Sequence, residues 1–258
     1  MEFNLSGKQL KEFPKINQCD ELKQLILSNN ELVSIPDTIS EFSNLKTLKL
    51  DTNRLISVPE SLGSLNHLET LVLSFNYISS LPKTLGNLAN LRFLELEHNK
   101  LKTLPFLVKF TKLVELNISD NLITVLPKHI GNLFILEKLS LRDNQVKILP
   151  NSIGSLKNLW FLDLYHNQLV SLPDSLGNLK SLRVLLLKSN NLISLPNTIG
   201  NLTNLQELIV RDNRINSLPL ELLNLVNLQY LDVEFNQLDV KSEKILEKLW
   251  EKGVKIHT

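Results

Sequence analysis

Apolar and polar residues follow one pattern along this chain, and the pattern returns every 23 residues. In the stretch from Leu159 to Ser181, alternating leucines are followed by an asparagine, a further leucine and then a Leu-Pro pair. All 10 prolines of the chain occupy one position of this pattern. Self-similarity at a fixed period of this length indicates a solenoid, in which each repeat contacts only its neighbours. The asparagines on the recurring position are Asn30, Asn53, Asn76, Asn99, Asn121, Asn144, Asn167, Asn190, Asn213 and Asn236, with steps of 23 residues except for 22 between Asn99 and Asn121.

The alternating part of each repeat predicts a short β-strand, as in residues 161–165. Because successive repeats stack, we expect one parallel sheet with leucines in the core and the alternate residues on a concave face. The Leu-Pro segment is predicted to return along the convex side as an irregular or 3₁₀ turn, where proline removes no ladder hydrogen bond. The fold class is therefore α/β, a horseshoe-shaped solenoid with a parallel concave β-sheet and a C-terminal helix-strand cap.

The repeating asparagine has an expected structural role. A turning main chain leaves N–H and C=O groups buried without sheet partners, and an amide side chain can both donate and accept. Stacked asparagines are therefore expected to satisfy such groups along the solenoid rather than to bind a ligand.

The unbroken period predicts one domain over residues 1–258. Residues 1–21 form a truncated first repeat, residues 22–238 the repeats, and residues 239–258 a cap. The repeats after Pro14 and Pro105 each lack one convex residue, and the strand register is expected to stay intact. The alignment also places Cys19, the single cysteine, on a core position.

The cap departs from the repeat pattern. Ile245, Leu246, Leu249 and Trp250 share one face of a predicted helix, which is expected to cover the open end of the core. A membrane-surface helix is the weaker alternative, because the segment is short and its charges are mixed.

The predicted bounds of that helix come from single residues. Ser242 is predicted as its N-cap and Gly253 as its end. Val254 and Ile256 then alternate as a closing edge strand.

Composition narrows the possible partners. The 28 lysines and arginines nearly balance the 27 aspartates and glutamates, so no global field favours nucleic acid. The start of the chain shows no secretory signal, and no run of 18 apolar residues predicts membrane insertion. One cysteine permits no intrachain disulfide. These features indicate a cytoplasmic protein, with export of a bacterial protein by another route as the alternative.

The repeat consensus, LPxxIGxLxNLxxLxLxxNxL, resembles one class of leucine-rich repeats over about residues 3–238. That class includes plant intracellular Ras-group proteins, animal Ras-pathway scaffolds and the 23-residue-repeat proteins of leptospires. The ending KILEKLWEKGVKIHT looks most like the leptospiral members. The resemblance implies a protein partner, usually on the concave face. For several bacterial members it implies contact with host molecules, so a surface or adhesion protein is an alternative function.

Function must be read from the positions that the repeat leaves free. Arg142, Tyr165, Lys188 and Arg211 occupy one such position in four consecutive repeats and predict a basic-aromatic stripe about 15 Å long. Aromatic residues and arginine are enriched at protein interfaces, although a solvated sheet face also carries mixed polar and aromatic residues. The candidate partner-binding residues are Arg142, Phe161, Asp163, Tyr165, His166, Lys188, Arg211, Tyr230, Glu234 and Phe235, with Phe93, Glu95 and Glu97 nearer the N-terminus.

Catalysis is a remote alternative. Asp143, His166 and Ser189 lie on adjacent repeats in the order of a hydrolase triad. However, the nearby N–H groups are expected in a parallel ladder, so no oxyanion hole is evident. His98 and His166 are three strands apart, about 15 Å, which is too far to share a metal ion. No phosphate-binding motif occurs, so we expect a non-catalytic module without cofactor or metal.

Overall fold

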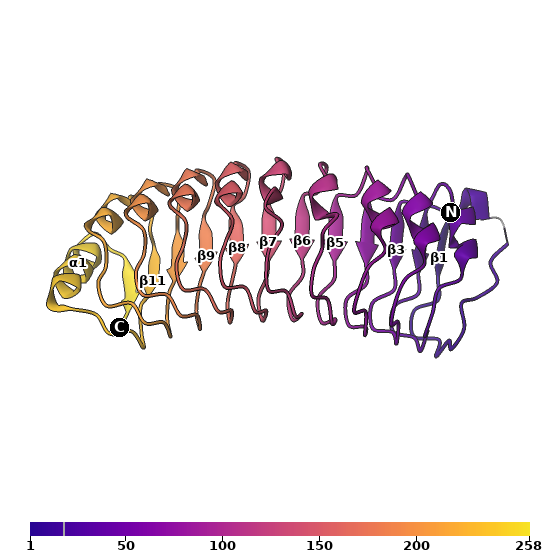
Figure 1. Cartoon of the computed structure of the whole chain (residues 1–258), viewed down its shortest axis with the longest axis horizontal. Helices are drawn as coiled ribbons and strands as arrows, with labels where there is room; N and C mark the ends of the chain where they lie inside the picture. Colours follow the sequence, from indigo (N-terminus) through magenta and orange to yellow (C-terminus); the bar gives the residue numbers. More distant parts are fainter. Residues whose placement is uncertain (18) are drawn as a thin grey trace. The chain divides into compact units, whose positions relative to one another are not determined.

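The computed structural model describes residues 1–17 and 19–258, with only the main chain of Cys19 (Figure 1). The predicted core position of the Cys19 side chain therefore lies outside the described part. Contacts divide the chain into two compact units, Met1–Ile123 and Thr124–Thr258. In both units short parallel strands alternate with 3₁₀ turns, as the leucine alternation and the Leu-Pro segments predict.

The first unit holds strands β1 to β6, each of which pairs in parallel with the next. The repeat that lacks one residue keeps its register, since Leu94 of β5 lies opposite Leu116 of β6. The missing residue is absorbed outside the strands, between Pro105 and Leu113, where η5 lies. The elements are β1 (Glu2–Asn4), η1 (Cys19–Glu21), β2 (Gln24–Ile26), η2 (Asp37–Glu41), β3 (Thr47–Lys49), η3 (Glu60–Ser64), β4 (Thr70–Val72), η4 (Lys83–Asn87), β5 (Phe93–Glu95), η5 (Leu107–Lys109) and β6 (Glu115–Asn117).

The second unit holds strands β7 to β12, again parallel and in chain order. Its strands lie side by side in Figure 1, and the 3₁₀ turns lie above the strands in that view. The elements are η6 (Ile130–Asn132), β7 (Lys138–Ser140), η7 (Asn151–Ser155), β8 (Phe161–Asp163), η8 (Asp174–Asn178), β9 (Val184–Leu186), η9 (Asn197–Asn201), β10 (Glu207–Ile209), η10 (Leu220–Asn224), β11 (Tyr230–Asp232), α1 (Val240–Glu251) and β12 (Lys255–His257).

The recurring asparagines form the predicted ladder. The Asn76 Nδ2 donates to the carbonyl of Leu73 at 3.0 Å in its own repeat and of Leu50 at 3.0 Å in the preceding one. Its Oδ1 accepts from the N–H of Leu55 at 2.9 Å. Asn167 repeats the arrangement in the second unit, bonding Leu141 and Val146. Asn76 and Asn167 thus each satisfy buried main-chain groups of two repeats.

The cap partly corrects the sequence prediction. Asp239, not Ser242, is the N-cap of α1, and its Oδ1 accepts from the Ser242 N–H at 2.8 Å. Ser242 is buried, and its Oγ accepts from the N–H of Leu218 at 2.8 Å. The serine therefore ties the helix to the last repeat, while the aspartate one turn earlier supplies the cap.

The apolar face of α1 is narrower than predicted. Ile245, Leu246 and Leu249 are buried, but the Trp250 side chain is 71% exposed. The helix ends where expected, since Gly253, which follows the C-cap residue Lys252, adopts φ +88°. β12 then pairs with β11 as the closing strand.

Candidate functional site

The candidate site is the solvent-facing side of the sheet in the second unit, which we call the open face. Each repeat contributes four outward residues, namely the first and third residues of the strand and the two residues before the ladder asparagine. The intervening leucines, such as Leu162 and Leu164, are fully buried. The alternation of the strand therefore decides which side chains a partner could touch.

An apolar centre lies on β9 and β10 of the open face. Val184 and Leu186 are the outward residues of β9, Ile209 is an outward residue of β10, and all three are half-buried rather than covered. β9 is parallel to β8 and β10, with Val184 opposite Phe161 and Leu186 opposite Ile209. The sequence prediction passed over these residues because it searched for aromatic and charged side chains. The all-apolar strand Val184–Leu186 was the available signal.

Tyr165 lies between two cations beside this centre. The Arg142 guanidinium is 4.6 Å from the centre of its ring, and the Lys188 ammonium is 5.3 Å away. Arg142 Nε also donates to Asp143 at 3.0 Å, and this bond raises the pKa of the guanidinium. Three of the four stripe residues predicted from the sequence are therefore in contact, with the aromatic ring held in place by cation–π interactions.

The fourth stripe residue, Arg211, is held by its neighbours. It forms an ion pair with Glu234 and lies 3.9 Å from the Asp232 carboxylate. Its guanidinium is 4.5 Å from the centre of the Phe235 ring. The charge of Arg211 is thus paired within the chain. The sequence predicted Arg211 as a residue that binds a partner protein.

Two aspartates of the open face are largely buried, namely the predicted site residue Asp163 and its counterpart Asp232 on β11. Asp163 is 8% exposed and Asp232 is 6% exposed. Burial raises the pKa of both carboxyl groups. The hydrogen bond from the Tyr165 N–H partly offsets this rise for Asp163, and the charge of Arg211 partly offsets it for Asp232. The Asp163 Oδ1 accepts from the Tyr165 N–H at 2.9 Å. Asp163 therefore shapes the main chain under Tyr165 and presents little surface to a partner.

Tyr230 contacts the closing strand at the other side of the open face. Its ring centre lies 5.3 Å from that of His257, and the Lys255 ammonium lies 5.7 Å from it. The candidates Phe93, Glu95 and Glu97 belong to the first unit, where Phe93 and Glu95 are outward residues of β5. The Arg92 guanidinium lies 5.7 Å from the Phe93 ring, and the Asn117 Nδ2 donates to Glu97 at 3.1 Å.

The residue before each ladder asparagine has a left-handed main chain. Its φ lies between +49° and +56° in every repeat from Asn29 to Phe235. Asn, Asp and His tolerate this conformation better than most residues, which accounts for much of the polar composition of the position. The residues concerned are Asn29, Thr52, Phe75, His98, Asp120, Asp143, His166, Ser189, Asp212 and Phe235.

Asp143, His166 and Ser189, the residues in triad-like order, all have this conformation, which favours the aspartate and the histidine. His166 Nδ1 lies 2.6 Å from Asp143 Oδ1. The Ser189 hydroxyl, however, donates to Asp212 at 2.8 Å, on the side away from the imidazole. The three residues therefore do not form one proton relay. His98 and Asp120 make the same imidazole-carboxylate contact in the first unit.

Within the residues that the structure describes, no group of histidine, cysteine and carboxylate side chains could hold a metal ion. No helix in the described part of the chain is long and apolar enough to cross a bilayer.

Solved structures resemble the chain at moderate identity. An internalin from Listeria monocytogenes is 24% identical, with a TM-score of 0.80 over 99% of this chain and 79% of that one. The ectodomain of the Arabidopsis thaliana receptor kinase GASSHO1/SCHENGEN3 is 28% identical, with a TM-score of 0.64 over 84% of this chain and 33% of that one. A leucine-rich-repeat protein of Leptospira interrogans is 26% identical, with a TM-score of 0.44 over 99% and 95% of the two chains.

Sequence models identify the family. No curated protein matches this chain. The model described as "Leucine-rich repeat region" matches residues 60–143, 96–189 and 124–258, and the model "Leucine Rich Repeat" matches residues 21–42. These matches cover most of the chain and coincide with the ladder repeats, so the chain belongs to the leucine-rich repeat family.

Proposed function

We propose that this chain is a non-catalytic protein-binding module whose partner docks on the open face of the second unit. The observation that carries the proposal is the apolar centre of Val184, Leu186 and Ile209, surrounded by aromatic and charged side chains. Protein interfaces have this arrangement, with a poorly charged core and a polar rim.

The aromatic residues around the centre would act as anchors. Tyr165 is fixed by Arg142 and Lys188, so it loses little side-chain freedom when a partner covers it. Pre-organised aromatic residues beside arginine are typical of the few positions that dominate binding energy. Asp163, in contrast, is expected to act only by holding the Tyr165 main chain.

Relatives support a binding role. The GASSHO1/SCHENGEN3 ectodomain was solved in complex with CASPARIAN STRIP INTEGRITY FACTOR 2, although the present chain spans only 33% of that structure. Within the family, the 23-residue period and the closing helix and strand support a place beside the leptospiral and plant intracellular Ras-group proteins.

A capture experiment with matched variants tests the proposal. The immobilised protein would be exposed to a lysate of the source organism, and the retained proteins would be quantified. Leu186→Arg places a charge in the apolar centre, and Tyr165→Ala removes the fixed ring. Each is expected to reduce retention of the specific partner at least tenfold, which corresponds to about 1.4 kcal/mol.

Ile193→Arg is the matched control for Leu186→Arg. Ile193 is an exposed aliphatic residue of the loop after the same repeat's asparagine, so it is outside the open face. Unchanged capture by Ile193→Arg together with loss in the other two variants would support the open face. Equal capture by all four proteins would refute it.

A further inference from the structure

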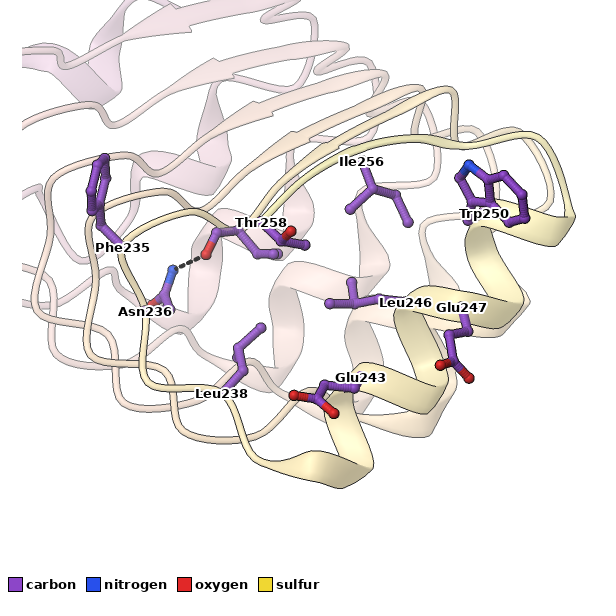
Figure 2. Close-up of a pocket in the computed structure, with 10 residues that line it drawn as sticks. Phe235, Asn236, Leu238, Glu243, Leu246, Glu247, Trp250, Ile256 and Thr258 are labelled. Atoms are coloured by element: carbon purple, nitrogen blue, oxygen red, sulfur yellow. Dashed lines mark hydrogen bonds between the residues drawn. The ribbon is translucent and has the colours of Figure 1, made fainter.

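A groove of about 690 Å³ lies at the C-terminal cap, between α1 and the chain around β11 and β12 (Figure 2). Its apolar lining includes Phe235, Leu238, Leu246, Trp250 and Ile256. In Figure 2 the rings of Phe235 and Trp250 lie at opposite ends, with Leu238, Leu246 and Ile256 between them. The groove belongs wholly to the second unit and shares only Phe235 with the candidate residues of the open face.

Two large aromatic side chains are left in solvent at this groove. Trp250 is 71% exposed and Phe235 is 68% exposed. A terminal cap normally presents a polar outer surface, because its task is to shield the core from water. An indole facing outward from the cap helix contradicts that task, and exposed apolar surface rimmed by polar residues is typical of an interaction site.

Phe235 is also held in an unfavourable main-chain conformation. Its φ of +53° is left-handed, which is an outlier for a bulky residue. The same position carries Asn29 and Asp212 in other repeats, residues that adopt this conformation readily, and a second phenylalanine, Phe75, in the first unit. Strained positions cluster at binding sites, where the surrounding structure keeps them. At Phe235 this conformation is combined with a ring that lines the groove and remains exposed.

The groove is acidic along its helical wall. Glu243 and Glu247 both line it, one turn apart on α1. Like charges at this spacing destabilise a helix. Neither carboxylate has an ion-pair partner in the part of the chain that the structure describes, although the same helix carries lysines. The two negative charges are therefore available to a cationic partner.

We propose that this groove binds a short protein segment in which a large apolar side chain is flanked by lysine or arginine. The apolar side chain enters between Phe235 and Trp250, over Leu246 and Ile256. The flanking cation meets the carboxylates of Glu243 and Glu247. This surface is a second one, separate from the apolar centre of the open face.

Trp250 can report on the groove directly. The chain contains 2 tryptophans, so Trp160→Phe leaves Trp250 as the only one. The probe is an acetylated and amidated hexapeptide with a central Leu-Phe pair and two lysines on each side. Binding is expected to shift the Trp250 fluorescence to shorter wavelength, because the indole moves from water into apolar contact. A peptide with glutamates in place of the lysines is expected to cause no shift.

Charge-matched variants separate the groove from general attraction. Glu243→Gln with Glu247→Gln is expected to weaken peptide binding at least tenfold. Asp174→Asn with Glu251→Gln makes the same change in net charge outside the groove lining and should leave binding unchanged. All the substituted side chains except Trp160 are polar, so far-UV circular dichroism should match that of the parent protein.

Three results would overturn the proposal. The first is no saturable shift up to about 1 mM peptide. The second is equal weakening by both double variants, which would indicate general charge attraction. The third is a shift that depends on protein concentration without peptide, which would assign the groove to a second copy of the chain.

Discussion

Asn76 satisfies main-chain groups of two repeats with a single amide, through bonds to Leu50, Leu73 and Leu55. The side chain is 3% exposed, so water cannot replace these bonds. Asn76→Ala is expected to lower the free energy of unfolding by about 2–5 kcal/mol, because each buried unsatisfied group costs about 1–3 kcal/mol. Urea unfolding followed by circular dichroism would measure the loss.

Asn204→Ser is the control for that change. Asn204 Nδ2 makes one exposed bond, to the Lys180 carbonyl at 2.8 Å, and Ser181 holds the same position in the preceding repeat. Its expected effect is within about 0.5 kcal/mol. If both variants lost the same stability, the ladder would not have the role described.

Asp163 gives a prediction about pH. Burial raises the pKa of its carboxyl in the folded protein, so the folded state binds the proton more tightly than the unfolded state. The contribution of this group to the free energy of unfolding therefore falls as pH rises from the ordinary aspartate range through the raised pKa. Asp163→Asn removes this loss and is expected to stabilise the protein at neutral pH.

The substitution keeps the local hydrogen bond. Asn117 occupies the corresponding position in the first unit and accepts from the Ser119 N–H at 3.1 Å, as Asp163 accepts from Tyr165. Urea unfolding at neutral and mildly acidic pH would compare the variant with Asp212→Asn, which removes an exposed charge. An Asp163→Asn protein with the parent's stability at both pH values would contradict the prediction.

At the scale of elements, the cap helix α1 depends on its first turn. The Asp239 carboxylate accepts from both the N–H and the hydroxyl of Ser242, at 2.8 and 2.7 Å. These bonds lower the pKa of Asp239. Asp239→Ala is expected to destabilise the cap, because the helix loses the side chain that caps its first turn.

Hydrogen exchange measured by mass spectrometry would localise that effect. Peptides from α1 should exchange faster in Asp239→Ala, while those from β8 and β9 should not change. Lys241→Ala, an exposed change in the same helical turn, should resemble the parent protein. Faster exchange throughout the second unit would show that the cap and the repeats open together.

At the scale of the whole molecule, periodicity predicted most of the fold. The alternating leucines predicted the strands and the recurring prolines predicted the turns, because these residues return at the same positions of successive repeats. The ladder role of asparagine followed from its two hydrogen-bonding groups. The cap was harder, since it occurs once: the sequence indicated Ser242 as the N-cap, whereas the structure has Asp239 there and Ser242 bonded to the Leu218 N–H.

The candidate site was predictable only in part. Because Arg142, Tyr165 and Lys188 hold the same position in consecutive repeats, the sequence indicated that they are neighbours, which the structure confirms. Arg211 and Glu234 hold the same position in adjacent repeats, but the sequence did not show their ion pair, because it depends on side-chain conformation. It also did not show the left-handed main chain shared by Asp143, His166 and Ser189.

The asparagine ladder limits how such a protein can change its length during evolution. Since each amide completes the main-chain bonding of the preceding repeat, an insertion of half a repeat would leave broken bonds on both sides. Duplication of one whole repeat adds about 4.8 Å of sheet and four new outward residues without disturbing the ladder. The step of 22 residues between Asn99 and Asn121 shows the permitted exception, a deletion confined to the 3₁₀ side. The surface available to a partner can thus grow by one repeat at a time, and each repeat adds its own four variable outward residues.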